Sequence, residues 1–259
     1  MSLVEEAEQR ALTRSCAQAA RLLMQHGAES ALVEVAAKRI GLKLGADSVE
    51  IAVMANAIVV SSLLNGHCIT TVRRVLDRGI NMGILVDVQR IMLDAEDGKI
   101  GSREIEARLE ALRPFHYNRW LVVLMVGAAC AAFARLAGAD PAACGLTFVA
   151  GAAAMAFRQQ LAHWKFNPLL NFCLTAFVAT SIAAQAIHFD FGTRTPHIAM
   201  ASSVLLLVPG VPLINSVADM VKGYVNTGIA RLVFAVLLCL GSCLGIALAL
   251  RVWKVPGWL

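Results

Sequence analysis

Residues 200–223, MASSVLLLVPGVPLINSVADMVKG, decide how the second half of the chain folds. The run is apolar and long enough to cross a membrane, because about 20 apolar residues span the hydrocarbon core. Pro209, Gly210 and Pro212 stand in its middle, and each proline removes a backbone donor and clashes with the preceding turn. We predict a membrane helix over about 197–221 that is broken at these residues; a simple proline kink is the alternative.

The polar residues of this run suggest a site. Asn215 and Asp219 are four residues apart and so share one helix face. Non-helical backbone at membrane depth is tolerated where it is buried in protein or lines a watery cavity, and broken helices form substrate sites in secondary transporters. The candidate substrate-binding residues of this helix are therefore Pro209, Gly210, Pro212, Asn215 and Asp219.

Asp219 permits two interpretations. An acid inside a membrane is costly and usually functional, often as a proton relay, so Asp219 could couple transport to protons or gate the site. Alternatively, Asp219 and Lys222 could form a solvated pair at the membrane surface.

Four further apolar segments qualify as membrane spans, which predicts five in all. Arg158 ends the second of them; it could attract an acidic substrate from the cytoplasm or anchor the helix at the membrane surface. Thr175 belongs to a polar series in the third, which could line a pathway or hydrogen-bond to a neighbouring helix. The four segments cover about 120–137, 141–158, 166–187 and 231–251.

Composition agrees with a membrane protein. Hydrophobic residues make up 58% and charged residues 16% of the 259 residues, against roughly 45–50% and about 25% in soluble domains. This excludes a disordered chain, a basic nucleic-acid-binding domain and a typical cytosolic enzyme. Residues 119–259 hold only three acidic residues, whereas 1–118 hold fifteen. We therefore expect a transmembrane domain over 119–259, in contact with the lipid bilayer.

Residues 1–118 predict a small α+β domain. Apolar residues recur at helical spacing over 5–26, 29–44, 82–97 and 102–113, with Ser102 as an N-cap. Between them the pattern alternates as in strands, and Asn65-Gly66 is a strong hairpin signal. The predicted order is ααβββαα.

The chain opens with an acidic, polar segment instead of a basic and then apolar leader. We therefore expect the N-terminal domain in the cytoplasm. A weak excess of basic residues on the same side agrees, and five spans then place the C-terminus in the periplasm. Seven cysteines form no C-x-x-C pair, so neither a metal site nor a cofactor is predicted.

Two polar groups of the N-terminal domain have competing interpretations. His26, Glu29, His67 and Cys68 are residue types of a hydrolytic site, but a histidine before a glycine is more often a helix cap. The basic turn 73–78 is a solvated face by default; contact with the membrane half or with an acidic substrate is the alternative.

Five stretches resemble the threonine/serine exporter family, over nearly the whole chain. They are HGAES (26–30), DRGINM (77–82), NFCLTAFVAT (171–180), the run 200–223 and NTGIAR (226–231). The resemblance is closer to the larger subunit of the family's two-component bacterial branch, which exports succinate. It implies a separately encoded small membrane partner subunit and an oligomeric complex. The 209–219 motif residues are the positions that it carries over as site candidates.

The resulting prediction is a secondary transporter subunit, not an enzyme, that exports succinate or a similar small carboxylate across the bacterial inner membrane. Backbone N–H groups at the break would bind the carboxylate. Threonine/serine export stays an alternative, because a basic residue attracts the carboxylate of either substrate. A membrane-anchored hydrolase and a regulatory subunit are the alternatives from other classes.

Overall fold

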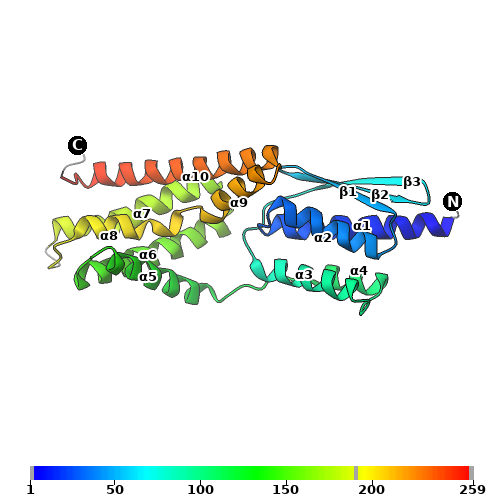
Figure 1. Cartoon of the computed structure of the whole chain (residues 1–259). Helices are drawn as coiled ribbons and strands as arrows, with labels where there is room; N and C mark the ends of the chain where they lie inside the picture. Colours follow the sequence, from blue (N-terminus) through cyan, green and yellow to red (C-terminus); the bar gives the residue numbers. More distant parts are fainter. Residues whose placement is uncertain (1–2, 190–191, 257–259) are drawn as a thin grey trace. The chain divides into compact units, whose positions relative to one another are not determined.

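The computed structural model describes residues 3–189 and 192–256 and divides into two compact units (Figure 1). Unit 1 comprises Met1–Phe115 and Val211–Val233, and unit 2 comprises His116–Gly210 and Phe234–Leu259. The units thus differ from the two contiguous domains expected from the sequence, because residues 211–233 pack with the N-terminal residues.

The N-terminal part of unit 1 has the predicted order ααβββαα. Its elements are α1 (Leu3–Gln25), α2 (Ser30–Lys43), β1 (Ser48–Val53), β2 (Ala57–Leu64), β3 (His67–Arg74), α3 (Met82–Glu96) and α4 (Ser102–Ala111). Residues of α9 (Gly210–Val221) and the first residues of α10 (Val225–Val252) complete the unit.

These N-terminal elements form three layers. The antiparallel sheet β1-β2-β3 covers α1 and α2, and α3 and α4 pack against the other side of these two helices (Figure 1). Alternation along β2 buries Ile58, Val60 and Ser62 on the face toward α1. The register pairs Ile58 with Arg73, which places this arginine on the same face of the edge strand β3.

The turns follow their local chemistry. Asn65 and Gly66 connect β2 and β3 with φ of 51° and 76°, the left-handed backbone of the predicted hairpin. Gly27, with φ of 90°, ends the first helix as expected. The prediction for Ser102 was wrong by one residue: Gly101 is the N-cap of α4, and Ser102 is its first helical residue.

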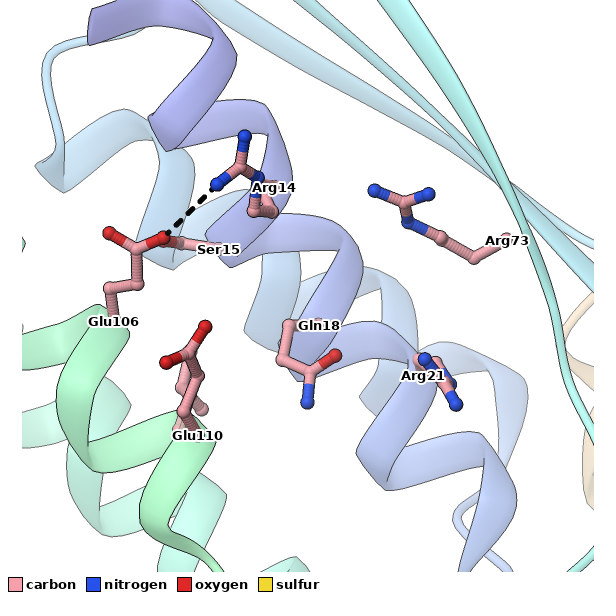
Figure 2. Close-up of a pocket in the computed structure, with 8 residues that line it drawn as sticks. Arg14, Ser15, Gln18, Arg21, Arg73, Glu106 and Glu110 are labelled. Atoms are coloured by element: carbon pink, nitrogen blue, oxygen red, sulfur yellow. Dashed lines mark ion pairs between the residues drawn. The ribbon is translucent and has the colours of Figure 1, made fainter.

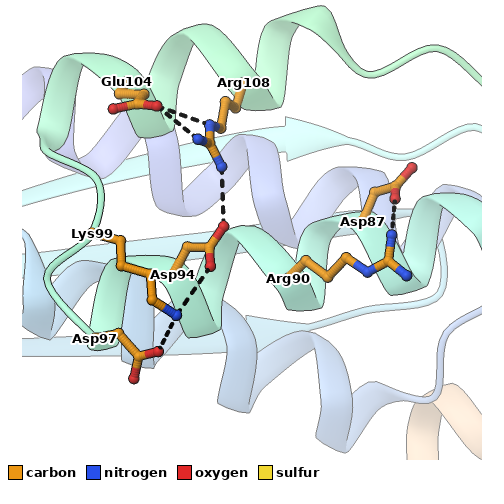
Figure 3. Close-up of polar contacts among 7 residues, drawn as sticks. All are labelled: Asp87, Arg90, Asp94, Asp97, Lys99, Glu104 and Arg108. Atoms are coloured by element: carbon orange, nitrogen blue, oxygen red, sulfur yellow. Dashed lines mark hydrogen bonds and ion pairs between the residues drawn. The ribbon is translucent and has the colours of Figure 1, made fainter.

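Ion pairs on the outer face join α3, α4 and the turn between them (Figure 3). Arg108 lies 3.0 Å from Asp94 and 2.7 Å from Glu104, and Lys99 lies 2.7 Å from Asp97. All of these side chains are substantially exposed, so each pair contributes little to stability. This charged face is solvated surface.

Unit 2 contains the apolar helices. These are α5 (Arg119–Leu136), α6 (Pro141–His163), α7 (Pro168–His188), α8 (Pro196–Ser203), the short 3-10 helix η1 (Leu205–Leu207) and most of α10. By length and composition, α5, α6, α7 and α10 could each cross a membrane. The α8–η1–α9 pair makes a fifth candidate if it is one span.

The predicted break is present in the chain. Pro196–Leu207 and Gly210–Val221 are bent by 58° across Val208 and Pro209. The second half-helix begins at Gly210, so Pro212 occupies its first turn, where a missing N–H costs least. The prolines therefore end one helix and begin another, and the continuous kinked helix is excluded.

Glycines let the helices of unit 2 approach closely. A Cβ at Gly127 of α5 would lie 2.9 Å from the carbonyl oxygen of Phe148 in α6, and one at Gly151 would lie 3.0 Å from the sulfur of Cys130. At Gly245 of α10, a Cβ would overlap the carbonyl oxygen of Cys173 in α7. The small residues of these segments therefore serve packing, which in lipid replaces the hydrophobic effect.

We expect Gly245→Ala to destabilise the protein by about 1–3 kcal/mol, because α7 and α10 must move apart to admit the methyl group. The thermal midpoint of the detergent-solubilised protein measures this. Gly145→Ala is the matched control, because nothing lies within 4 Å of a Cβ at that position of α6. Equal midpoints for the two variants would contradict the close contact.

Candidate functional site

The loop at residues 26–30 connects α1 to α2 and is held by backbone contacts from the 77–82 stretch. The N–H of Arg78 donates to the carbonyl of Gln25 at 3.0 Å, and the N–H of Asn81 donates to that of His26 at 3.1 Å. Ile80 covers Gly27, where a Cβ would lie 3.2 Å from Ile80 Cγ1. Two stretches about 50 residues apart in the sequence therefore form one surface.

Asp219 binds this loop from the other end of the chain. Its carboxylate is fully buried and accepts hydrogen bonds from the backbone N–H of Ser30 at 2.8 Å and from Ser30 Oγ at 2.9 Å. Ser30 is the first residue of α2, and the N-cap, Glu29, makes no side-chain capping bond. Asp219 thus supplies the acceptor and the negative charge that a helix N-terminus favours.

Arg231 completes the charge balance. Its Nη1 lies 3.0 Å from Asp219 Oδ2, and its Nη2 donates to the carbonyl of Ala28 at 2.8 Å. Asn215 Nδ2 donates to the carbonyl of Gly27 at 2.8 Å. We call loop 26–30 with Asn215, Asp219 and Arg231 the Asp219 cluster.

Exposed and half-buried contacts surround the Asp219 cluster. Lys222 pairs with Glu29 at 2.7 Å, and Thr227 Oγ1 donates to the carbonyl of Val53 at 3.1 Å. The hydroxyl of Tyr224 donates to Glu34. Burial raises the pKa of Tyr224 to about 12, and the bond to Glu34 adds to this.

These contacts decide the alternative left open for Asp219. The solvated pair with Lys222 is wrong, because Lys222 binds Glu29 and Asp219 is completely buried. A buried ion pair does not in itself add much stability, but removing one partner leaves an uncompensated charge. The arrangement therefore fixes the position of α9 on the N-terminal helices within unit 1.

Gly228 explains why the 226–231 stretch needs a small residue. A Cβ at this position of α10 would lie 2.8 Å from the carbonyl oxygen of Ser216 in α9. Close contact between α9 and α10 brings Arg231 to Asp219.

Unit 2 holds a second group of predicted residues, around Arg158 of α6. The guanidinium lies 4.7 Å from the ring centre of Phe172 in α7 and donates to the carbonyl of Leu206 at 3.3 Å. Asn171 donates to the carbonyl of Arg158 at 3.2 Å and accepts from the hydroxyl of Thr175 at 3.1 Å. We call Arg158, Asn171, Phe172, Thr175 and the Leu206 carbonyl the Arg158 cluster.

Arg158 has no counter-charge within the residues that the structure describes, since no carboxylate there lies within 4.0 Å of it. It is half-buried on a candidate membrane helix, and its hydrogen bond reaches a carbonyl three residues before Pro209. Ionisable groups in such positions are usually functional. An anion would complete the charge balance of this cluster.

The structure thus sorts the predicted site residues into two clusters and the break. Asn215 and Asp219 belong to the Asp219 cluster, whereas Arg158 and Thr175 belong to the Arg158 cluster. Pro209, Gly210 and Pro212 make the break. Sequence reasoning missed Ser30 and Arg231 as partners, although both stand in stretches that carry the family resemblance.

The residues of the hydrolytic alternative are not brought together. His26 Nδ1 lies 2.9 Å from the carbonyl of Leu22, the cap-like contact expected as the default. Gln9 binds the carbonyl of His67 at 2.9 Å, and α1 separates Gln9 from His26 by about 25 Å at 1.5 Å per residue. No group of three potential metal ligands occurs in the described part of the chain.

Three features are typical of a multi-pass membrane transporter: the apolar helices of spanning length, the bent pair Pro196–Leu207 and Gly210–Val221, and the half-buried Arg158, which has no counter-charge among the described residues. A family model described as "Putative threonine/serine exporter" matches residues 14–253. The chain belongs to this family.

Several curated proteins are similar to the chain. A protein of Klebsiella aerogenes named "Probable succinate transporter subunit YjjP" is 48% identical over 254 residues, which cover 98% of each chain. Its namesake in Escherichia coli K12 is 48% identical over 251 residues, 97% of this chain and 98% of that protein. A "Probable threonine/serine exporter" of Mycobacterium tuberculosis is 24% identical over 90% of this chain and 44% of its own length. No solved structure shows significant similarity.

Proposed function

We propose that the chain is the larger subunit of a bacterial inner-membrane exporter of succinate or a similar small carboxylate. The observation that carries the proposal is Arg158, a half-buried cation without a described counter-charge beside the broken helix. Full-length similarity to two proteins named as succinate transporter subunits supports the same substrate class. The word "subunit" in those names supports a partner, which we take to be a small membrane subunit of the same family.

The Arg158 cluster suits a carboxylate. The ring of Phe172 packs against the guanidinium, and Nη1 donates to the carbonyl of Leu206. The remaining N–H groups can bind a carboxylate with two parallel bonds. Thr175 and Asn171 add hydroxyl and amide groups nearby in sequence and in space.

The break supplies a second kind of donor. The first N–H groups of a helix have no acceptor within it and carry the positive end of the helix dipole. In α9 the N–H of Gly210 donates to the carbonyl of Val208 at 2.9 Å and Pro212 has no N–H, so the remaining first-turn groups are those of Val211 and Leu213. A substrate carboxylate at the break would be bound by this helix end, as the sequence suggested for Pro209–Pro212.

The Asp219 cluster would serve as the gate. Asn215, Asp219 and Arg231 tie the second half-helix to loop 26–30 by buried polar contacts. Protonation of Asp219 would remove the charge that Arg231 and the α2 N-terminus stabilise. In this mechanism a proton releases α9, and the transport cycle uses that release.

Catalysis has no part in this proposal. Transporter-family membership favours a protein without enzymatic activity, and we assign no cofactor. The hydrolase alternative would need His26 to act on a substrate, yet its Nε2 is buried without a hydrogen-bond partner among the described residues. A purely regulatory subunit predicts, instead, that the small partner exports succinate alone.

Efflux of labelled succinate and labelled threonine from preloaded cells tests the function. The cells carry this chain alone, the small subunit alone, or both. We expect faster succinate efflux only with both. Threonine efflux alone would assign the substrate of the other family branch, and efflux with the small subunit alone would support the regulatory role. Unchanged efflux of both compounds in all three strains would contradict the transporter proposal.

We further propose that residues 1–118 lie in the cytoplasm and the C-terminus in the periplasm. Cys68 on β3 is exposed, whereas burial raises the pKa of the Cys16 thiol to about 12 and keeps it unreactive. In a variant whose five unit 2 cysteines are replaced by alanine, a membrane-impermeant maleimide should label Cys68 only after permeabilisation. Labelling in intact cells would reverse the orientation. A variant that also carries Cys68→Ser is the control and should stay unlabelled.

A further inference from the structure

A cavity of about 220 Å³ lies in unit 1 among α1, β3 and α4 (Figure 2). Among the side chains that line it are Arg14, Gln18 and Arg21 of α1, Arg73 of β3, and Glu106 and Glu110 of α4. It is smaller than the about 300–1,000 Å³ of pockets for drug-sized molecules, so it suits a small metabolite.

Charge is distributed unevenly in this cavity. Glu106 and Glu110 lie on one wall, and Arg21 and Arg73 lie on the opposite side of Gln18 (Figure 2). Arg14 faces Glu106 at 3.8 Å, which leaves Glu110, Arg21 and Arg73 without an opposite charge within 4.0 Å among the described residues. One wall is therefore acidic and the other basic.

Two observations argue for a ligand at the basic wall. Arg21 Nε is buried and has no hydrogen-bond partner among the described residues, although a buried donor without an acceptor is unfavourable. The strand register directs Arg73 toward α1, on the face that buries Ile58. A carboxylate between the two arginines would accept from both.

We propose that this cavity is a binding site for a small zwitterion, whose carboxylate contacts Arg21 and Arg73 and whose ammonium group contacts Glu110 and Glu106. Glu110, which has no cationic partner within 4.0 Å among the described residues, would attract the ammonium group of a zwitterion, and a dianion offers it no such contact. The site lies outside the Asp219 cluster and the Arg158 cluster. It gives unit 1 a ligand of its own, independent of the export path.

Calorimetric titration of the purified full-length protein with glycine, L-alanine, L-threonine, succinate and inorganic phosphate tests the proposal. We expect an amino acid to bind, and Arg21→Gln and Arg73→Gln each to weaken binding roughly tenfold or more, as the loss of a charge-assisted contact predicts. Glu110→Gln should also weaken it. Arg90→Gln is the matched control, because Arg90 is exposed on α3 and pairs with Asp87 outside the cavity.

Glu110→Gln separates the two ligand classes. For a zwitterion it removes a partner and weakens binding, whereas for succinate or phosphate it removes a repulsion and strengthens binding. Tighter binding of an anion in this variant would overturn the proposal, as would binding of an amino acid that all three cavity variants leave unchanged. Absence of amino-acid binding to the unaltered protein would overturn it as well. In the Arg158→Gln background, amino-acid binding should persist, which distinguishes the cavity from the proposed transport site.

Discussion

Asp219→Ala is expected to destabilise unit 1 by about 3–5 kcal/mol and to abolish export, because it leaves the Arg231 guanidinium and the Ser30 N–H without their buried acceptor. Denaturant unfolding of the solubilised protein measures the stability, and hydrogen exchange at the start of α2 measures the local effect. Lys222→Ala is the control on the same helix. Its pair with Glu29 is partly exposed and contributes about 0–1 kcal/mol.

Asp219→Asn distinguishes the structural role of Asp219 from its proposed role in coupling export to protons. The amide keeps the size of the side chain and one acceptor for Ser30, but it removes the charge that faces Arg231. We expect the complex to assemble and export to stop, because a neutral side chain cannot alternate between two charge states. A normal export rate in this variant would eliminate the coupling role. If Asp219→Ala were as stable as Lys222→Ala, the structural role of Asp219 would be eliminated.

Arg158→Gln should lower succinate efflux by roughly tenfold to a hundredfold, because a charge-assisted contact to the substrate contributes about 1.5–3 kcal/mol. Initial efflux rates from preloaded cells at several internal concentrations measure the effect. The thermal midpoint should change little or rise, since the variant removes a half-buried charge that has no described counter-charge.

Lys165→Asn is the matched control for Arg158→Gln. Lys165 is exposed, follows α6 and has φ of 58°, a left-handed conformation that asparagine tolerates. We expect unchanged efflux. Equal losses in both variants would mean that basic residues act only through general attraction of anions to this side of the protein, and would exclude a specific contact at Arg158.

Much of the local structure follows from the sequence. The apolar segments gave helices near their predicted bounds, because about 20 apolar residues in a row have few alternatives to a buried or membrane helix. Pro209 and Pro212 broke their helix, since a missing donor and a steric clash are properties of the residue itself. Asn65-Gly66 formed its hairpin for the same local reason.

Only the tertiary structure decided which polar groups meet. Nothing in the sequence pairs Asp219 with Ser30, 189 positions away, or Arg158 with the carbonyl of Leu206. Nor could helical spacing distinguish a solvated Asp219–Lys222 pair from the buried Asp219–Arg231 pair. Periodicity determines which face of a helix is apolar, whereas the partner of a buried charge depends on which distant helix covers that face. The helices and strands therefore follow from the local sequence, whereas the candidate site forms only when they pack together.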